Sequence, residues 1–378
     1  MRCARLAAAA LGLALLALRS PAEELGRRTE NVVLIVSDGL RWQEVFRGAE
    51  DALTREDCGG VEDRDAVRRE YWRGTAEERR RALLPFFWTV IAERGQLFGN
   101  QTEGSLAHDT NGQDFSYPGY NEMLTGAPDP RIDSNDPVPN PNTTVFEWLN
   151  RQPPLAGRVA AFGTWSVFDA IFNAKRSGLK TCSGWRPADV CLAPPAPDML
   201  RRLYGTTTRY WADNAWDSFL QASVLDEIRR NQPRVLFVGY GETDEWAHLG
   251  RYDLLLESAR NTDRFIAELW DTMQSIPQYR GKTTFLITAD HGRGQGLEDW
   301  KEHGNDTPGS SEIWIAALGP DTPAWGERKQ TAAVTQAQIA ATVAALLGYD
   351  YRKAFPAVAP PLEDVLGASR AAVSRRSP

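Results

Sequence analysis

The stretch Lys282-Thr-Thr-Phe-Leu-Ile-Thr-Ala-Asp-His-Gly292 decides the fold that this sequence predicts. It is a run of β-branched and other apolar residues that stops abruptly at Asp290 and His291. Such a run is typical of a strand that is buried on both faces of a parallel sheet. Open α/β sheets bind their ligands at the carboxyl ends of their strands. The stretch therefore predicts a buried strand that delivers two metal-type ligands to the functional edge of a sheet.

A second apolar run, residues 31–39, has the same design, because it ends at Asp38 and Gly39. Further strand candidates alternate with helical patterns along the rest of the chain, which predicts a mostly parallel sheet with helices on both faces. The other strand candidates are 96–100, 158–163, 234–240 and 313–318, and the helix candidates are 81–94, 116–126, 143–150, 165–174, 212–230, 252–273 and 337–347. The expected fold class is α/β with a doubly wound sheet.

The chain of 378 residues is long enough for one large α/β unit. We expect a single catalytic domain over 31–350, with loop or cap insertions at about 48–81 and 177–198. The first insertion is charged and rich in turn residues, and the second is rich in proline, glycine and tryptophan, as expected of a lid. Residues 359–378 are expected to form a loosely ordered tail.

The first 22 residues have the pattern of a secretory signal peptide. Arg2 and Arg5 precede the apolar run 6–18, and Ser20 to Ala22 supply small residues for cleavage. About a dozen apolar residues are too few to span a bilayer. The sequence therefore predicts a secreted or periplasmic protein without a membrane span in the mature chain, and an uncleaved anchor is the alternative.

The cysteines leave one pairing question open. Removal of the signal segment also removes Cys3 and leaves Cys58, Cys182 and Cys191. Cys182 and Cys191 enclose a short loop and could form a disulfide in an oxidising compartment. With that disulfide formed, Cys58 would be unpaired. The alternative is that Cys182 and Cys191 are two free thiols.

The overall charge argues against nucleic acid as a partner. The net charge is -7 and the isoelectric point is about 5.4, and no basic block stands out. A dedicated nucleic-acid surface would need clustered basic residues. The sequence does not indicate an oligomeric state.

The histidines are concentrated beside acids. The chain has four, and His248, His291 and His303 each lie within four residues of an acid near the end of a predicted strand. His108 has no matching place at such a strand end. Asp244 precedes His248 by four residues, so one helical turn would place both side chains on one face. Imidazole and carboxylate together suit zinc. These residues are therefore metal-ligand candidates.

Asp38, Asp290 and Ser116 extend this set to two metals. With Asp38 and Asp290 there are three acids and three histidines, which suffice for two ions if one more side chain contributes. Ser116 opens a predicted helix, and a hydroxyl on a metal at that positive end would ionise more easily and become a nucleophile. The alternative for Ser116 is an ordinary helix cap, and the alternative for Asp38 is a turn.

These residues, in this order, carry a family resemblance. The order Asp38, Ser116, Asp244 with His248, Asp290 with His291, and His303 resembles the two-metal set of the alkaline phosphatase superfamily. The local pattern is most similar to its nucleotide pyrophosphatase/phosphodiesterase branch, in which a hydroxyl residue, an aromatic residue and a proline open the nucleophile helix and Thr-Gly closes it. Ser116-Tyr117-Pro118 and Thr125-Gly126 match this pattern. The resemblance covers residues from about 32 to 347.

The resemblance implies a fold like that of alkaline phosphatase and a ligand set for two divalent ions. One ion would be held by Asp244, His248 and His303, and the other by Asp38, Asp290, His291 and the Ser116 oxygen. Zinc is favoured, although manganese or iron accepts the same ligands. The implied reaction is in-line attack of Ser116 on phosphorus, followed by hydrolysis of the phosphoserine by metal-bound water. This predicts an exported hydrolase of small-molecule phosphate esters, either a phosphodiesterase or a phosphomonoesterase.

The sequence departs from that branch in the substrate-binding positions. Phosphodiesterase relatives usually have asparagine and histidine where this chain has Gly119 and Tyr120, and no arginine clamp is evident. Asn135 lies at nearly the separation at which that branch places an asparagine that helps to hold the transferred oxygen. Trp165 and Trp185 are further candidates for the substrate pocket, with core packing as the alternative.

Three alternative functions compete with this prediction. A sulfatase of the same superfamily needs arginine four positions after its modifiable residue, where this chain has Tyr120. A phosphoglycerate-mutase-like enzyme would carry a large inserted domain, for which the chain lacks room. A non-catalytic, metal-stabilised binding protein would be expected to have lost the nucleophile or a ligand, and none is lost.

Overall fold

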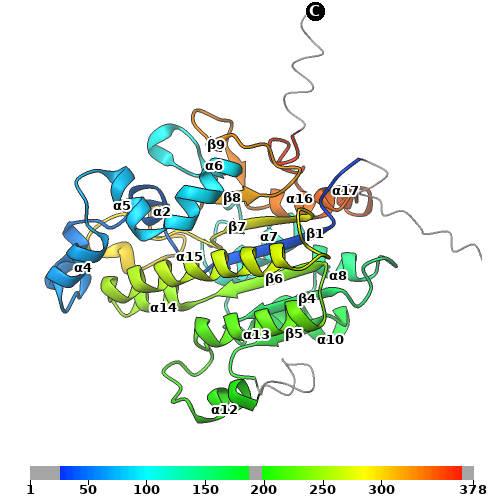
Figure 1. Cartoon of the computed structure of the whole chain (residues 1–378), viewed down its shortest axis with the longest axis horizontal. Coiled ribbons are helices and arrows are strands. Elements are labelled where there is room, and N and C mark those ends of the chain that lie inside the picture. The colour runs from blue at the N-terminus through cyan, green and yellow to red at the C-terminus, as the bar shows by residue number, and fades with distance from the viewer. Residues whose placement is uncertain (1–25, 187–197, 368–378) are drawn as a thin grey trace, which may run out of the picture.

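The computed structural model describes residues 26–186 and 198–367. The predicted signal segment, 1–22, lies outside these ranges. Figure 1 shows a central sheet with helices packed against it. The sheet has eight strands in the order β5-β4-β6-β1-β7-β8-β2-β9.

The sheet is mostly parallel, as predicted. The strands from β5 to β7 are parallel to one another, whereas β8 is antiparallel to both of its neighbours. The strands are β1 Asn31–Ser37, β2 Gln96–Phe98, β4 Val159–Gly163, β5 Lys180–Ser183, β6 Val235–Tyr240, β7 Thr283–Thr288, β8 Ile315–Leu318 and β9 Gly326–Glu327. A separate pair joins β3 Ala107–His108 to β10 Val334–Thr335.

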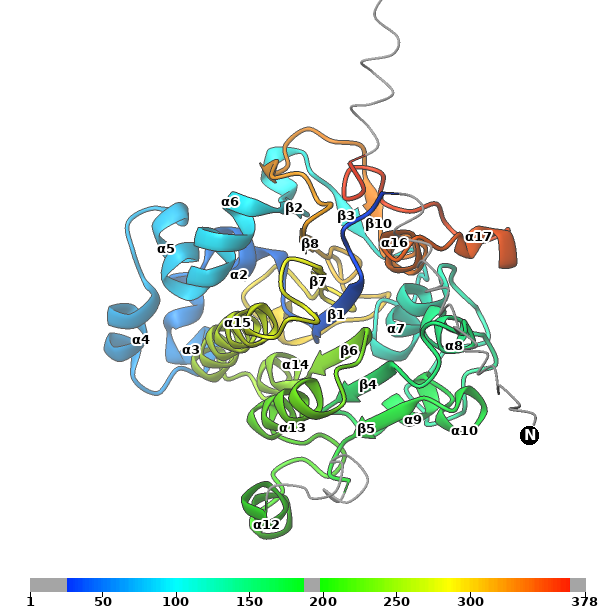
Figure 2. The ribbon, with the colours of Figure 1, turned by 45° about the vertical axis from the view of Figure 1, so that its right-hand side comes forward.

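Helices cover both faces of the sheet, and Figure 2 shows α13 and α15 on one side and α7, α8 and α16 on the other. The α-helices are α2 Trp42–Arg47, α3 Glu56–Gly59, α4 Arg64–Tyr71, α5 Ala76–Leu83, α6 Ala92–Arg94, α7 Ser116–Thr125, α8 Val145–Asn150, α9 Phe168–Ile171, α10 Ala174–Ser177, α12 Asp198–Thr206, α13 Asp217–Arg230, α14 Glu242–His248, α15 Tyr252–Ser275, α16 Gln338–Leu346 and α17 Tyr351–Ala354. Short 3-10 turns span Ala52–Thr54, Gln101–Glu103 and Asp299–Lys301, and a π-helix spans Phe87–Ile91. Within the described ranges, no helix has the length and apolar character required to cross a membrane.

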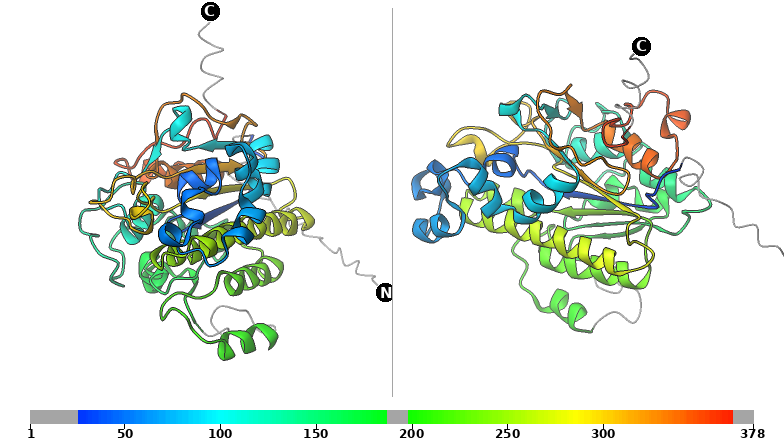
Figure 3. Two further views of the ribbon diagram at one scale, coloured as in Figure 1. Left: turned by 90° about the vertical axis from the view of Figure 1, so that its left-hand side faces the viewer. Right: turned by 45° about the horizontal axis from the view of Figure 1, so that its top comes forward.

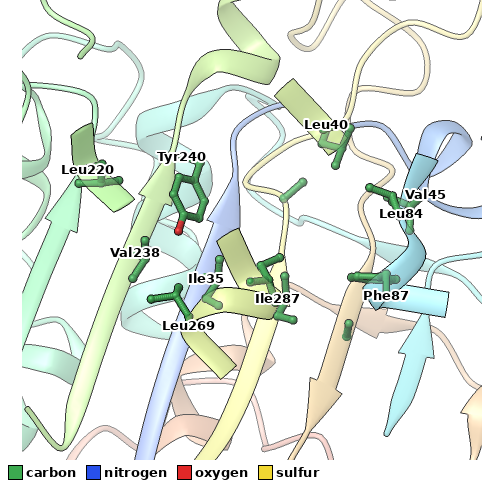
Figure 4. Packing of buried hydrophobic residues seen from close by; sticks show 14 of the residues in the cluster. Ile35, Leu40, Val45, Leu84, Phe87, Leu220, Val238, Tyr240, Leu269 and Ile287 are labelled. Carbon is green, nitrogen blue, oxygen red and sulfur yellow. The ribbon is translucent and has the colours of Figure 1, made fainter. Parts of the chain in front are cut away.

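Two hydrophobic cores lie on opposite faces of the sheet. Successive residues of β1 alternate between them: Ile35 belongs to the core under α15, and Leu34 belongs to the core under α7. Ile35 is paired with Val238 of β6 and Ile287 of β7, and Leu269 of α15 packs over this layer (Figure 4). Burial on both faces explains why β1 and β7 are almost continuously apolar.

The segment 48–81, expected to be turn-rich, is largely helical. It contains the 3-10 turn at 52–54, α3, α4 and most of α5. Asp63 caps α4 by accepting from the Ala66 amide, and Thr75 and Glu78 form a capping box at the start of α5. Such caps satisfy the free amides of a helix start. The charged residues of the segment suggested turns, whereas the helix caps at Asp63 and Thr75 were the signal for helices.

The predicted helix 81–94 is interrupted at Leu84, the residue before Pro85. Proline lacks an amide hydrogen and disfavours the helical conformation in the residue before it. The carboxylate of Asp263, from α15, accepts hydrogen bonds from the Phe86 and Phe87 amides, both at 2.9 Å. The helix therefore restarts after the proline with a partner from another part of the chain.

The second expected insertion, 177–198, begins with the edge strand β5, so its described part extends the sheet and does not form a lid. Cys182, in β5, is disulfide-bonded, and Cys58 is a free, partly buried thiol. The predicted partner Cys191 lies outside the described residues. Helix α12, which follows, stands off from the sheet beyond α13 in both views of Figure 3.

Two further expectations differ in detail. The predicted helix 165–174 is split into α9 and α10 at Asn173, whose φ of 41° is left-handed. The tail expected to be loose from residue 359 is packed in its described part, since Leu362 and Val365 are buried. Apolar side chains in a proline-containing segment were the available signal for that packing.

Paired glycines beneath the functional edge make a testable packing site. Gly163 and Gly239 are adjacent in β4 and β6, and a Cβ atom on Gly239 would lie 2.7 Å from the Phe168 ring. Gly239→Ala should lower the free energy of unfolding by about 1–3 kcal/mol because the core is overpacked. Gly205→Ala, in α12 with no atom within 4 Å, is the control and should be neutral or stabilising. Urea denaturation of both variants measures this, and equal stabilities would contradict the packing argument.

Candidate metal centre

The candidate ligands follow three neighbouring strands. Asp38 comes directly after β1, and Asp290 and His291 come two and three residues after β7. Asp244 and His248 lie in α14, which begins two residues after β6. Because β6, β1 and β7 are adjacent and parallel, their carboxyl ends meet at one edge of the sheet. The sheet therefore brings together ligands that are up to 253 residues apart in the chain.

The first candidate ion site, termed the inner site, surrounds the Nε2 atom of His291. This nitrogen lies 3.4 Å from Asp38 Oδ1, 3.6 Å from Asp290 Oδ2 and 3.7 Å from Asp244 Oδ1. Ser116 Oγ lies 3.5 Å from the same nitrogen. The side chains of Asp290 and His291 are fully buried. The structure thus brings Asp38, Asp290 and Ser116 to within 3.6 Å of this nitrogen. At this site, the three side chains whose ligand atoms all lie within 4.8 Å of one another are Asp38, His291 and Asp244, the last of which was predicted for the other ion.

The donor atoms of the inner site fit a cation. Asp38 Oδ1 and Asp290 Oδ2 are buried and have no hydrogen-bond partner. Leaving buried carboxylate oxygens without a partner is costly, and a bound ion would satisfy both. Oxygen and imidazole donors are those that zinc, manganese and iron accept.

The second candidate ion site, termed the outer site, consists of Asp244, His248 and His303. His248 Nε2 lies 3.3 Å from Asp244 Oδ2 and 3.0 Å from His303 Nε2. The i, i+4 spacing places Asp244 and His248 on one face of α14, as predicted. The side chain of His248 is 39% exposed, so this site is open to solvent.

The field at the site favours positive charge. Burial disfavours the charged form of His291, yet Asp290 and Asp38 raise its pKa to about 10. Burial and the neighbouring Asp38 carboxylate raise the pKa of Asp290 well above its usual range. Burial and the neighbouring His291 lower the pKa of His303 to about 2, which leaves its ring neutral and able to bind a metal. The acids that favour a proton on His291 would also favour a divalent cation.

Ser116 is the first residue of α7, and its side chain does not cap the helix. Phe115 is the N-cap residue, and no side chain caps the helix from that position. The amide of Tyr117 instead donates to Asn135 Oδ1 at 2.9 Å. The serine hydroxyl therefore remains directed at His291, and the cap alternative does not describe its contacts. Asn135 lies beside the candidate nucleophile, although its role in substrate binding stays a prediction.

Gly119 and Tyr120, the two departures from the related branch, have structural roles at the site. A Cβ atom on Gly119 would overlap the backbone oxygen of Asp290, so glycine allows α7 to lie against the end of β7. The hydroxyl of Tyr120, which is fully buried, donates to Asp38 Oδ2 at 3.0 Å. Tyr120 thus orients one oxygen of Asp38 and leaves the other free for an ion.

Arg293 is the main site residue that the sequence reasoning missed. Its side chain is fully buried, and its guanidinium donates to Asp244 Oδ1 and to the Lys301 carbonyl. Burial disfavours the ionised Asp244 carboxylate, but Arg293 and His248 hold its pKa well below the usual range. Arg293 follows His291 by two residues, and that proximity was the available signal.

The two tryptophans differ from the expectation. Trp185 is 8% exposed, donates to the Trp211 carbonyl and packs against Tyr204 and Phe219. The structure thus places Trp185 in the core. Trp165 follows β4 at the functional edge, where its indole donates to Asp213 Oδ2 at 3.2 Å. Neither contacts a candidate ligand in the interactions described.

The fold and the site together define an α/β protein with aspartates and histidines gathered at the strand ends, where they could hold cations. Residues 210–351 match the model of the Metalloenzyme superfamily. This segment contains Asp244, His248, Asp290, His291 and His303. It begins after Asp38 and Ser116, so the match does not include those two residues. No curated protein sequence matches the chain.

Solved structures share the fold of this chain. Wild-type alkaline phosphatase PafA has a TM-score of 0.59 at 11% identity, covering 90% of this chain and 99% of that chain. The phosphonate monoester hydrolase of Silicibacter pomeroyi has a TM-score of 0.55 at 13% identity, covering 90% and 77%. A Bacteroides thetaiotaomicron protein from a locus for the metabolism of multiple glycosaminoglycans has a TM-score of 0.53 at 14% identity, covering 90% of this chain and 82% of that chain. The chain has the alkaline phosphatase fold, and the phosphodiesterase branch is not confirmed.

The contact between Tyr120 and Asp38 generates a prediction. Tyr120→Phe keeps the ring but removes the hydroxyl that orients Asp38, and such losses weaken metal binding by about 10–100-fold. Calorimetric titration of the metal-free protein with Zn²⁺ measures the change. Tyr279→Phe is the matched control, since that buried hydroxyl donates to Pro233 just before β6, at the opposite edge of the sheet. Equal affinities in the two variants would contradict an orienting role for Tyr120.

Proposed function

We propose that the protein is a metal-dependent hydrolase of small-molecule phosphoric esters that acts through Ser116. The main evidence is the position of Ser116 Oγ, which lies at the start of α7 and 3.5 Å from His291 Nε2. Three acids and three histidines converge at the same edge of the sheet. The superfamily match and a fold shared with a phosphatase and a phosphonate monoester hydrolase support this proposal.

The proposed sites would hold two divalent cations, for which zinc is favoured. Asp38, Asp290, His291 and Ser116 would hold the inner ion, since their polar atoms surround His291 Nε2. Asp244, His248 and His303 would hold the outer ion. When bound, such ions stabilise the entering and leaving oxygens of an in-line displacement and favour ionisation of a hydroxyl.

The residues of the chain prepare Ser116 for attack. The Nδ1 atom of His291 lies 2.8 Å from the Gly292 carbonyl, which can only accept. In the neutral ring the Nδ1 atom therefore carries the proton, and Nε2 presents its lone pair toward Ser116 and Asp38. The start of α7 carries partial positive charge, which favours a negatively charged serine oxygen.

The proposed reaction has two displacements. Ser116 Oγ forms a bond to phosphorus while the bond to the leaving alcohol breaks, and the alcohol leaves with a proton. Water then attacks the phosphoserine and releases Ser116 and a phosphate or a phosphate monoester. The reaction consumes one water, and the remaining substituent on phosphorus decides between monoester and diester hydrolysis.

Export from the cytoplasm forms part of the proposal. It rests on the signal-like segment 1–22, and the disulfide bond at Cys182 supports an oxidising compartment. N-terminal sequencing of the protein purified from its native host would test cleavage, and an intact N-terminus on a cytoplasmic protein would contradict export.

Metal removal tests the proposed chemistry. Purified protein is expected to contain about two equivalents of divalent metal, to lose esterase activity with a chelator and to regain it with Zn²⁺, because the ligands are supplied by a two-ion site. Elemental analysis and a nitrophenyl phosphate assay measure both effects. Full activity in metal-free protein would rule out the proposed chemistry.

Replacement of the nucleophile tests the role of Ser116. Ser116→Ala should reduce turnover of nitrophenyl phosphate monoesters and diesters by at least about 10³-fold, because covalent catalysis is lost. Metal binding by Asp244, His248 and His303 should remain. Ser218→Ala, on the exposed face of α13, is the control. Undiminished turnover would show that another nucleophile acts, and a panel that includes sulfate esters would identify a sulfatase.

A further inference from the structure

Arg293 is a buried cation inside a site that should bind cations. Its side chain is fully excluded from solvent, and a buried guanidinium is stable only when it is paired. Its carboxylate partner is Asp244, a candidate metal ligand. A positive charge at this position repels a nearby divalent ion, so its presence requires an explanation.

Asp244 is the one residue that belongs to both candidate ion sites. Its Oδ2 atom lies 3.3 Å from His248 Nε2 of the outer site. Its Oδ1 atom lies 3.7 Å from His291 Nε2 of the inner site and 3.8 Å from His303 Nε2 of the outer site. A carboxylate that lies between the histidines of both sites could bridge the two ions. The Arg293 guanidinium affects whether Asp244 can bridge, because it donates a hydrogen bond to Oδ1.

The guanidinium is fixed from three sides. It donates to Asp244 Oδ1, to the Asp244 backbone oxygen at 3.2 Å and to the carbonyl of Lys301, two residues before His303. A Cβ atom on Gly39 would lie 2.8 Å from Arg293 Nε and 2.7 Å from Asp244 Oδ1, so the glycine after Asp38 leaves the required space. Arg293 therefore joins the segments that carry Asp244 and His303, and it packs against the glycine that follows Asp38.

We propose that Arg293 is a positioning residue that reserves Asp244 for the outer ion. It occupies Oδ1 and repels an ion from that oxygen, so that Asp244 binds through Oδ2 together with His248 and His303. The inner ion is then left to Asp38, Asp290, His291 and Ser116. This inference rests on the proposed function, since it assumes that both sites bind ions.

The sign of the effect distinguishes this role from ordinary structural support. Loss of a residue that merely supports a ligand weakens metal binding by about 10–100-fold. Removal of a unit positive charge a few ångströms from an ion strengthens binding, by a factor on the order of a thousand at intermediate dielectric. The charge effect is the larger, so removing Arg293 should tighten binding of the inner ion and allow Asp244 to bridge.

A crystal structure of the full protein loaded with Mn²⁺ tests the geometry directly, with anomalous scattering to locate the ions. In the wild type, Asp244 is expected to bind one ion through Oδ2 while Arg293 remains on Oδ1. In Arg293→Met, Asp244 is expected to bridge two ions. A bridging Asp244 in the wild type would overturn the role of Arg293 alone. A wild-type crystal without ions at these residues would overturn both this role and the proposed function.

Titration of the metal-free proteins with Mn²⁺ gives the second readout, which is independent of catalysis. Arg293→Met should bind the inner ion at least about tenfold more tightly, and Arg293→Lys, which keeps the charge, should stay within about threefold of the wild type. Arg80→Met removes a largely buried arginine paired with Glu327 away from the site and is the control. Unchanged or weaker binding in Arg293→Met would overturn the proposal. If that variant does not fold, the wild-type crystal and Arg293→Lys still decide it.

Discussion

The parallel pairing of β1 between β6 and β7 is the constraint on which the rest of the structure depends. It places the ends of three strands at one edge, and the turns that follow carry Asp38, Asp290 and His291. These strands are apolar almost throughout because both faces are covered. A one-residue change of register would turn their side chains to the wrong core and displace the ligands.

The same edge concentrates charge that the interior would otherwise disfavour. Asp290 and His291 are fully buried, and Asp38 nearly so. Such groups remain stable only through mutual compensation, by His291 and Arg293 in the protein and by the cations proposed here. The tyrosine on Asp38 and the arginine on Asp244 each engage one carboxylate oxygen, which leaves the other directed into the site. The charged groups are thus oriented before any ion binds.

The sequence predicted the features that depend on local pattern. The apolar runs located β1, β6 and β7, and the four-residue spacing placed Asp244 and His248 on one helix face. It failed where partners are distant in the chain: Asp263 restarts a helix after Pro85. The roles of Gly119 and Arg293 follow from contacts with Asp290 and Asp244, which no periodicity encodes.

The sheet also separates the serine and the outer ligands into the two layers that pack on its opposite faces. Tyr117 and Tyr120 of α7 pack in one core, whereas Ala247 of α14 packs in the other, so the serine and the outer ligands belong to different layers. Layers of a protein can open independently, with free energies below that of global unfolding. Partial opening of the α7 layer would then withdraw the serine while the outer ion stays bound. An inactive protein could in this way retain metal, and inactivation by heat need not coincide with metal release.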